Sequence, residues 1–358
     1  MYWLIENEEQ LKILLNSGFK KAFVEVIPYN DTIHPTLNKV SLVYIRPIDA
    51  HKGFMVCVTH NESLNALDTD LYTLLTKFDV LYCRDKKEIL HYYPLKTLYD
   101  ITAPPHTYIR PTTKAHEIFY NQHKDETCVN AIIPIVKHYE LCEHIFEDLK
   151  TNINRPKTKY DEFFNTKVSL VFNYLERSGI QIHKPTFEEH FHKIDGERTY
   201  TQYNLRTTTT RPSNKFKNVN YAALSHKNGC RKSFIPSNGV FIDIDISAYH
   251  PSLSCRLINY DFPSVDIHSH LQKLYGVSYA KSKELTFKQL YGGVFKEYKH
   301  LEFFKKIDIY VKDLWNKFES EGEITCPISN FVYKKENLED MNPQKLFNYL
   351  LQNLETSM

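Results

Sequence analysis

Apolar residues in the first half of the chain recur with two different spacings. Short apolar runs rich in β-branched and aromatic residues predict strands at 23–27, 40–45 and 55–58, and helical spacing predicts helices at 8–16, 71–78 and 132–149. A further helix is expected from Phe163 to Ser178, with Val168, Val171 and Leu175 on one side and Gly179 beyond its end. These patterns predict an α/β or α+β layer, followed by a polar linker at 151–159 and a domain boundary near residue 155.

The second half changes character twice. Residues 240–246 alternate in a way that predicts a buried strand, and the remainder is predominantly helical. Helices are expected at about 267–276, 279–296, 301–321 and 343–356, the last with Asn342 as its N-cap and Pro343 at its first position. No internal repeat or low-complexity segment is present.

Length and composition describe an ordinary folded chain. Its 358 residues suffice for two or three domains at about 150 residues each, with 42% hydrophobic and 25% charged residues. No window is long and apolar enough to span a membrane, and the N-terminus lacks a secretory pattern, so a cytoplasmic location is expected. The seven cysteines are scattered without a C-x-x-C pair, which favours free thiols over disulfides or structural zinc.

The net charge of +2 conceals one strongly basic stretch. From Arg198 to Ile242 there are eight Lys or Arg residues and no Asp or Glu. A solvated loop would explain this equally well as a surface that contacts a phosphate backbone, where cations provide affinity and short polar groups fix register. Charge alone leaves both interpretations open.

Two aspartates follow this stretch within FIDIDISAYHPSL. Asp243 and Asp245 would point to the same face of a strand, because strand side chains alternate. Such an aspartate commonly caps the helix that follows. The alternative is Mg²⁺ held by one or two carboxylates together with substrate phosphates, as two-metal phosphoryl transfer requires.

A second candidate group lies in AKSKELTFKQLYGG. Lys283, Phe287 and Tyr291 are four residues apart in turn and share one face of a helix. They could form a packed flank with a lysine that extends to solvent. Alternatively, the face could hold an incoming nucleotide, with Lys283 on the triphosphate, Phe287 on the sugar and base, and His268 adding a donor to the phosphates.

From about residue 163 to its end, the chain resembles the polymerase domain of family A DNA polymerases, in a divergent, phage-like branch. Seven elements in the family's order carry the resemblance: FNYLERSGIQIH (the helix leading into the thumb), TTTTRPSN (T-x-T-G-R-L-S-S), CRKSFIP (the basic pair before the palm strand), FIDIDISAYHPSL (the first palm motif), DIHSHLQKLYGV (D-I-H-T), KELTFKQLYGG (the fingers helix K-x3-F/Y-G-x2-Y-G) and KLFNYLLQNLETSM (N-x-x-x-Q). Seven elements in order are more specific than any one alone.

The resemblance implies a role for each matching residue. Asp245 would be the catalytic, metal-binding aspartate for Mg²⁺, and Lys283 would act on the leaving group. The implied nucleotide-binding residues are His250, His268, Lys283, Phe287 and Tyr291, and the implied DNA-binding residues are Arg211, Asn220, Arg231 and Gln352. Phe287 in place of tyrosine implies poor use of dideoxynucleotides.

Several positions depart from the family pattern. His250 stands where the family has a glutamate that discriminates against ribonucleotides, and Lys288 replaces a glycine. Tyr279 replaces an arginine, with Lys281 nearby as a substitute. The third motif, which supplies a further metal carboxylate, is not found before Met358, and the partly similar tripeptide at 160–162 lies far upstream. We therefore expect a C-terminal polymerase fragment or continuation as a partner.

The N-terminal segment occupies the place of the family's 3′-5′ exonuclease domain. AFVEVIPYND retains only Glu25 of the metal-binding carboxylates, and CRDKKEILHYY resembles the second exonuclease motif in a deficient form, with Asp85 not placed as a ligand. Tyr120 and Asp125 are five residues apart, whereas the third exonuclease motif has a spacing of four. An inactive exonuclease-like domain is expected, and an unrelated α/β domain stays an alternative.

The expected fold class is α+β. Residues 1–155 would form a degenerate exonuclease-like (RNase H-like α/β) domain, and residues 156–358 an incomplete right-hand polymerase domain with thumb, palm and fingers parts. The expected function is template-directed addition of dNTPs to a primer 3′-hydroxyl on primer-template DNA, by two-metal phosphoryl transfer in phage DNA replication. A catalytically inactive primer-template DNA-binding protein and a single-subunit RNA polymerase-like enzyme are the alternatives.

Overall fold

A computed structural model describes residues 3–63, 68–102, 130–214, 219–263 and 266–357 of the chain. These residues form two compact units. The N-terminal unit holds the described residues up to 204 together with 214 and 219–240, and the C-terminal unit holds 205–213 and the described residues from 241 onward.

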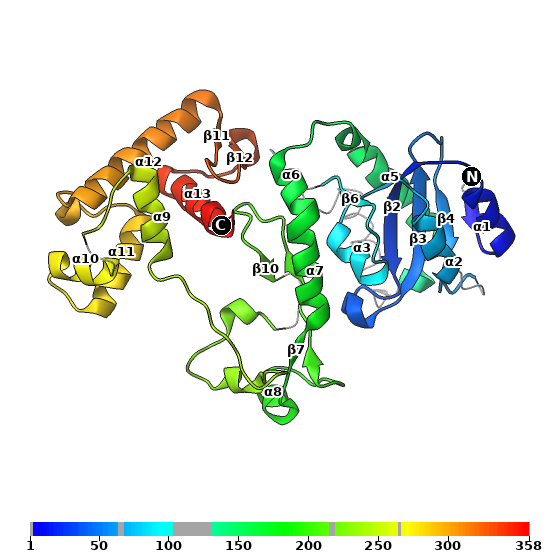
Figure 1. Ribbon diagram of the computed structural model, residues 1–358, viewed down its shortest axis with the longest axis horizontal. Coiled ribbons are helices and arrows are strands. Elements are labelled where there is room, and N and C mark those ends of the chain that lie inside the picture. The colour runs from blue at the N-terminus through cyan, green and yellow to red at the C-terminus, as the bar shows by residue number, and fades with distance from the viewer. Residues whose placement is uncertain (1–2, 64–67, 103–129, 215–218, 264–265, 358) are drawn as a thin grey trace. The chain divides into compact units, whose positions relative to one another are not determined.

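A six-stranded mixed sheet is the centre of the N-terminal unit (Figure 1). Its strands are β1 (Trp3–Ile5), β2 (Lys21–Pro28), β3 (Val40–Pro47), β4 (Phe54–Cys57), β5 (Val80–Cys83) and β6 (Leu98–Asp100), in the order β1-β4-β3-β2-β5-β6. Strands β2, β3 and β4 pair antiparallel, whereas β5 pairs parallel to β2 and β6 parallel to β5. The three strands predicted from the sequence are confirmed.

Helices cover both faces of this sheet. The helices are α1 (Glu8–Leu15), α2 (Asp68–Leu75), α3 (Lys86–Tyr92) and α5 (Ile135–Leu149). Because strand side chains alternate, Val24 of β2 enters the core shared with α1, α2 and α3, while its neighbour Phe23 enters the core shared with α5. The result is a helix–sheet–helix sandwich with two hydrophobic cores.

The helix predicted over 163–178 is buried on its polar side. It consists of α6 (Lys159–Phe163), a π-helical turn (Phe164–Val168) and α7 (Ser169–Ser178). The buried residues of α7 are Ser169, Asn173 and Glu176, whereas Val171 and Leu175 are 53% and 47% exposed. The reason is a hydrogen-bonded contact with α3: Glu176 accepts hydrogen bonds from this helix, and its polar side must therefore face inward.

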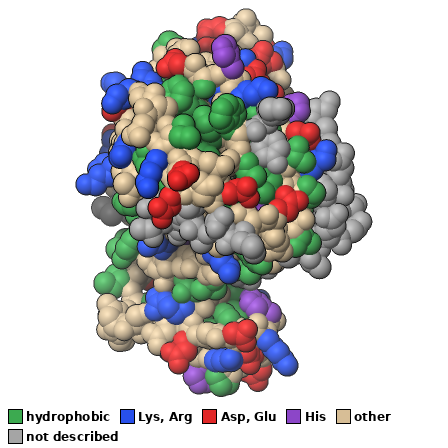
Figure 2. All heavy atoms as spheres, turned by 90° about the vertical axis from the view of Figure 1, so that its right-hand side faces the viewer, with side chains coloured by type: hydrophobic (Ala, Val, Ile, Leu, Met, Phe, Trp, Pro, Cys, Tyr) green, Lys and Arg blue, Asp and Glu red, His purple; other side chains and the backbone are tan. Residues whose placement is uncertain are grey.

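The basic stretch 198–242, of which 205–213 and 241–242 belong to the C-terminal unit, has little regular structure in its described residues. It follows α8 (Lys184–His190) and includes the short strand β9 (Tyr203–Asn204) and two 3-10 turns, Tyr221–Ala223 and Cys230–Ser233. The two-residue strands β7 (Ile180–Gln181) and β8 (Arg198–Thr199) pair antiparallel at its start, and β10 spans Ser213–Asn214. Figure 2 views the molecule from the side of the N-terminal sheet, where basic and acidic side chains are interspersed.

The C-terminal unit is mainly helical. It contains α9 (Tyr249–Ile258), α10 (Ile267–Tyr275), α11 (Tyr279–Gly292), α12 (Glu302–Glu321), α13 (Pro343–Ser357) and a hairpin of β11 (Glu323–Thr325) with β12 (Val332–Lys334). Phe304, Phe318 and Phe347 are fully buried in the hydrophobic core of this unit. The four helices predicted here are confirmed, and Asn342 accepts a 2.9 Å hydrogen bond from the Lys345 N–H, as expected of the N-cap. Helix α11 ends at Gly292 rather than 296, because Gly293 adopts a φ of +98° and caps it.

The predicted buried strand at 240–246 is wrong. These residues are irregular, and the side chains of Ile242 and Ile244 are 82% and 86% exposed. A strand needs a neighbour for its backbone groups, and none of the strands in the described part of the chain lies beside this segment. The sequence does alternate between apolar and polar residues, but the described residues provide no neighbouring strand that would cover the apolar side chains.

Two further expectations concern the whole chain. The six cysteines that the structure describes are all free thiols, as predicted. None of the helices in the described ranges is long and apolar enough to cross a membrane.

Candidate functional site

Helix α11 carries Lys283, Phe287 and Tyr291 on one face, as its spacing predicted. The helix is capped by Ser278, whose Oγ accepts a 3.3 Å hydrogen bond from the Lys281 N–H. The Phe287 and Tyr291 rings stack with centroids 5.8 Å apart and an interplanar angle of 16°. This offset pair gives the face a flat apolar surface of the kind on which a base or sugar can rest.

The three lysines of α11 are not equivalent. Lys281 and Lys288 both form ion pairs with Glu284, at 2.9 and 2.5 Å, and the two cations hold the pKa of Glu284 at about 2. Lys283 has no carboxylate partner among the described residues, and its Nζ lies 4.9 Å from the centroid of the Tyr279 ring. Lys283 is therefore the cation of this helix that is available to an anionic ligand.

His268 of α10 lies beside this face but is buried. Its ring centroid is 5.8 Å from that of Phe287 and 6.2 Å from that of Tyr279, and the residue is 2% exposed. Burial, together with the charge of Lys283, lowers the pKa of His268, so the imidazole is neutral. Its Nδ1 is buried and has no hydrogen-bond partner among the residues that the structure describes.

His250 joins α9 to the exposed face of α11. The helix begins after Ala248, which adopts a left-handed φ of +50°. The His250 Nδ1 is hydrogen-bonded to the Tyr291 hydroxyl, and the two rings meet edge to face with centroids 5.7 Å apart. Burial, with the nearby Glu355 carboxylate, raises the pKa of Tyr291 to about 12, so the phenol keeps its proton.

Arg211 reaches the same group from the loop 205–213. Thr210, directly before Arg211, adopts a left-handed φ of +61°, a conformation that usually favours glycine. Its hydroxyl accepts a 2.9 Å hydrogen bond from Asn353 Nδ2 and is 2.8 Å from the Thr356 hydroxyl, so α13 holds the loop. The next residue, Arg211, places Nη1 3.7 Å from Glu355 Oε2 while remaining more than half exposed.

Helix α13 contributes two residues that the sequence did not single out. Asn353 is fully buried, and its Oδ1 accepts a 2.5 Å hydrogen bond from Ser329. Glu355 contacts both His250 and Arg211. No local signal marks Glu355, because its partners are separated from it by more than a hundred positions. The predicted Gln352 lies on the same helix and is partly exposed.

Asp243 and Asp245 lie in the exposed irregular segment before α9. Among the described residues, no three His, Cys, Asp or Glu side chains gather closely enough to hold a metal ion. Two carboxylates in one segment suit Mg²⁺ that is also held by substrate phosphates, because this ion usually takes only one or two protein carboxylates. The donor set therefore fits Mg²⁺ bound together with a nucleotide, but it does not form a complete protein site.

The other two predicted DNA-binding residues belong to the N-terminal unit. Asn220 is exposed before the turn Tyr221–Ala223. Arg231 is also exposed, and its Nη2 donates a 3.1 Å hydrogen bond to the Leu224 carbonyl and lies 2.8 Å from His226 Nε2. These contacts hold the guanidinium at the surface of the basic stretch.

The carboxylates that the sequence analysis compared with exonuclease motifs form contacts within the N-terminal unit. Glu25 on β2 accepts a 3.0 Å hydrogen bond from Arg84 Nε just after β5, and burial raises the pKa of Glu25 although Arg84 opposes the shift. Asp85 caps α3 by accepting from the Glu88 N–H. The predicted pair Tyr120 and Asp125 lies outside the described residues.

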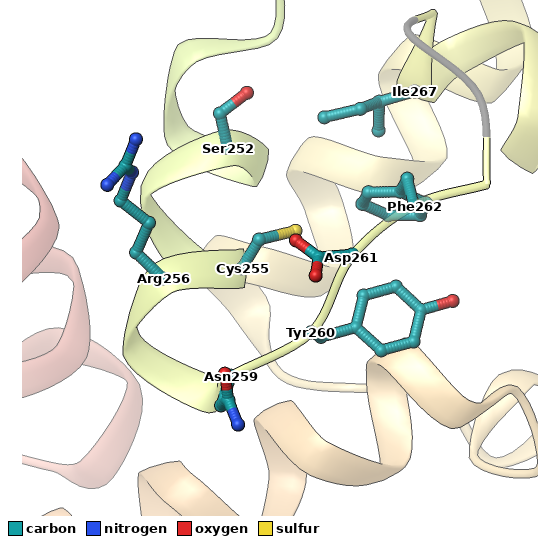
Figure 3. Close-up of a pocket in the computed structure, with 8 residues that line it drawn as sticks. All are labelled: Ser252, Cys255, Arg256, Asn259, Tyr260, Asp261, Phe262 and Ile267. Carbon is teal, nitrogen blue, oxygen red and sulfur yellow. The ribbon is translucent and has the colours of Figure 1, made fainter.

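An open pocket of about 570 Å³ lies at the end of α9 (Figure 3). Its lining includes Cys255, Asp261 and Phe262, and Figure 3 shows Arg256 pointing away from the other labelled side chains. Burial and the Asp261 carboxylate raise the pKa of Cys255 to about 11, so its thiol is not a nucleophile. None of the sequence-predicted site residues lines this pocket.

Comparison with solved structures gives a clear likeness. The sequence matches no protein-family model and no curated protein. Among solved structures, the POL domain of Pol1 from M. smegmatis, in complex with DNA primer-template and dNTP, is similar with a TM-score of 0.66 at 10% sequence identity. The match covers 99% of this chain and 86% of that chain. The fold is therefore that of a DNA polymerase POL domain.

Proposed function

We propose that this chain is a DNA-directed DNA polymerase of the family A type that adds dNTPs to a primer 3′-hydroxyl under the direction of a template. The observation that carries the proposal is the exposed face of α11. On this face Lys283, which has no carboxylate partner among the described residues, precedes the stacked rings of Phe287 and Tyr291. His250 is hydrogen-bonded to the Tyr291 hydroxyl and lies at the C-terminal end of this face. A cation followed by a flat aromatic surface is complementary to a nucleoside triphosphate.

In this proposal each residue has a defined task. Lys283 binds the triphosphate, offsets charge on the pyrophosphate leaving group and supplies a proton to it. Phe287 and Tyr291 hold the sugar and base beside the templating pair, and His268 supports this face from within. Arg211, Asn220, Arg231 and Gln352 contact the primer-template duplex.

Asp245 would hold Mg²⁺ together with the substrate phosphates. When bound, Mg²⁺ stabilises charge on the attacking and leaving oxygens of an in-line displacement. Asp245 lies in an exposed segment and is free to take this position. The residues of this chain otherwise bind and orient the nucleotide and the duplex.

We also propose a partner for the segment 240–246. Its exposed isoleucines alternate with Asp243 and Asp245, so a neighbouring strand would bury one side and leave the carboxylates on the other. A C-terminal polymerase fragment or continuation that brings such a strand, with a further carboxylate, would complete the metal site. The hydrophobic exposure of Ile242 and Ile244 supports this arrangement.

Residues 1–155 are proposed to form an exonuclease-like domain without exonuclease activity, with residues 156–358 as the partial polymerase domain. The strand order β4-β3-β2-β5-β6, with three antiparallel strands and two parallel ones, supports an RNase H-like sheet. The Glu25–Arg84 pair places a guanidinium on the carboxylate that a metal would need. A DNA strand labelled at its 5′ end should therefore keep its length when incubated with the chain and Mg²⁺.

Primer extension on a DNA hairpin with Mg²⁺ and dNTPs tests the polymerase proposal, with binding to the same hairpin recorded in parallel. Extension that is abolished in Asp245→Ala would mean that the chain holds a complete catalytic centre. Binding without extension, and extension when the C-terminal partner is added, would support the proposed division of the metal site. Extension that is equally fast in Asp245→Ala would contradict the role of Asp245.

Two other functions follow from particular observations. The exposed Asn220 and Arg231 in the basic stretch would also suit a non-catalytic protein that binds primer-template DNA. His250 at the position of the sugar-selecting glutamate favours a single-subunit RNA polymerase-like enzyme. Extension with rNTPs in preference to dNTPs would identify the second, and binding that never leads to extension with any partner would identify the first.

A further inference from the structure

Glu355 joins three elements of the C-terminal unit at one carboxylate. It lies near the end of α13, and its Oε2 is 3.3 Å from His250 Nε2 on α9. The same oxygen is 3.7 Å from Arg211 Nη1 in the loop 205–213. The His250 side chain is 8% exposed and the Glu355 side chain 26%, so the first contact is largely shielded from water.

The hydrogen-bond chemistry of this group fixes the orientation of the His250 ring. A carboxylate only accepts hydrogen bonds, so the proton must be on His250 Nε2, which donates to Glu355. In the neutral ring, Nδ1 is then an acceptor, and Tyr291 donates its hydroxyl proton to it. Each ring nitrogen thus has one partner, and a flipped ring would satisfy neither.

The negative charge of Glu355 is also balanced by its neighbours. Tyr291 keeps its proton because its pKa is raised to about 12, partly by the Glu355 carboxylate. Arg211 offsets the carboxylate, but its guanidinium is 57% exposed and can still reach a second anion. His250 stands where the resemblance to family A polymerases would place a glutamate, and α13 brings the carboxylate of Glu355 to that same side chain.

We propose that Glu355 is a positioning residue for sugar selection: by holding the His250 imidazole against Tyr291, it keeps the ring where it excludes a 2′-hydroxyl. This inference rests on the proposed function and deepens it. It commits the site to 2′-deoxynucleoside triphosphates over ribonucleoside triphosphates. Without Glu355, the imidazole is free to rotate away, and the ribose is admitted.

The test compares nucleotide binding to the full chain on a hairpin whose primer ends in a dideoxynucleotide, so that no turnover is needed. The apparent Kd of the complementary dNTP and of the matching rNTP are measured for each variant. In Glu355→Ala we expect the preference for dNTP to fall about 10-fold, the equivalent of one lost hydrogen bond, through tighter rNTP binding. Glu339→Ala removes an exposed carboxylate of the same unit and should leave the preference unchanged.

Two further variants separate positioning from folding. Glu355→Asp keeps the charge near Arg211 but withdraws its oxygen from His250, and it should lose preference like Glu355→Ala. Glu355→Gln has a side chain of the same length, so its amide oxygen can still accept the hydrogen bond from His250. This variant should retain most of the preference for dNTP over rNTP. In a protein that already carries His250→Ala, the further change Glu355→Ala should not lower the preference for dNTP any more, because Glu355 acts only through the His250 ring.

The outcomes distinguish the two levels of the proposal. If the unaltered chain prefers dNTP but Glu355→Ala and Glu355→Asp weaken both nucleotides equally, Glu355 has only a structural role and the inference is overturned. A wild-type preference for rNTP would overturn it as well. If no nucleotide binds in response to the template, the proposed function itself fails, and the inference fails with it.

Discussion

Lys87 on α3 donates a 2.6 Å hydrogen bond from Nζ to Glu176 Oε1 on α7, and the two side chains are 3% and 0% exposed. The other carboxylate oxygen is 2.8 Å from His91 Nε2, and the Tyr203 N–H donates to Oε1. Helix α7, the first long helix after the predicted linker, is thus held against α3 of the N-terminal unit by one carboxylate whose two oxygens both accept hydrogen bonds.

Removing one member of this pair should destabilise the N-terminal unit. Glu176→Leu leaves the Lys87 ammonium buried without its partner, which typically costs about 3–5 kcal/mol of unfolding free energy. The double variant Lys87→Met with Glu176→Leu should recover most of the loss, because apolar groups of similar volume need no partner. Urea unfolding measures both, and a cost below about 1 kcal/mol for the single variant would show that the pair is not structurally important.

The Glu25–Arg84 pair should give the N-terminal unit a distinctive pH dependence. Since the pKa of Glu25 is raised in the folded state, the folded state binds the proton more tightly, and stability is lost as pH rises from 4.5 through the folded pKa. Arg84→Met removes the charge that opposes this shift. In this variant the free energy of unfolding should continue to fall up to a higher pH than in the unaltered protein. At neutral pH the variant should be less stable by about 3 kcal/mol or more.

Unfolding free energies of Arg84→Met between pH 4 and 8 check this directly. The double variant Arg84→Met with Glu25→Leu is the control, since it lacks the titrating carboxyl and should lose the added slope. An Arg84→Met protein whose stability is independent of pH across this range would be inconsistent with a buried, ionised Glu25.

Thr210 should be replaceable by glycine at lower cost than by alanine. Both changes remove the hydroxyl that bonds Asn353 and Thr356, but only glycine adopts the φ of +61° without strain. We expect Thr210→Gly to be more stable than Thr210→Ala by about 1 kcal/mol, with both less stable than the unaltered protein. Thermal unfolding of the two variants decides the order, and an alanine variant as stable as the glycine variant would argue against strain at this position.

Lys283 and Lys281 should differ sharply in their effect on nucleotide binding. Lys281 already pairs with Glu284, whereas Lys283 has no carboxylate partner among the described residues. Lys283→Ala should weaken dNTP binding to the hairpin complex about 10- to 100-fold, the value of a charge-assisted hydrogen bond to phosphate. Lys281→Ala should change it less than about 3-fold. Equal effects of the two substitutions would indicate only a general contribution of positive charge.

The sequence predicted those elements whose signals are local. The helices α10, α12 and α13 begin and end within about one residue of their predicted bounds, because periodicity, Asn342 and the terminal glycines mark them. The shared face of Lys283, Phe287 and Tyr291 likewise follows from spacing within one helix. Local information is sufficient in each of these cases.

The features that were missed depend on distant partners. The alternation at 240–246 has the pattern of a strand, but burial requires a neighbouring strand that no local pattern can guarantee. In α7 the apolar side looked like the buried one, yet Glu176 turns the helix the other way through its contacts with α3. Glu355 joins the site only because α13 packs beside α9 and α11, which spacing along the chain does not reveal.

If the α11 face binds the incoming nucleotide, nucleotide binding to the chain should follow the template. The rate at which the chain dissociates from hairpins that differ only in the templating base, with each of the four dNTPs and Mg²⁺, measures this. We expect that only the complementary dNTP slows dissociation and that the effective dNTP changes when the templating base is changed. If all four dNTPs act alike on every hairpin, or none has an effect, the chain does not select nucleotides by template and the proposed polymerase function is wrong.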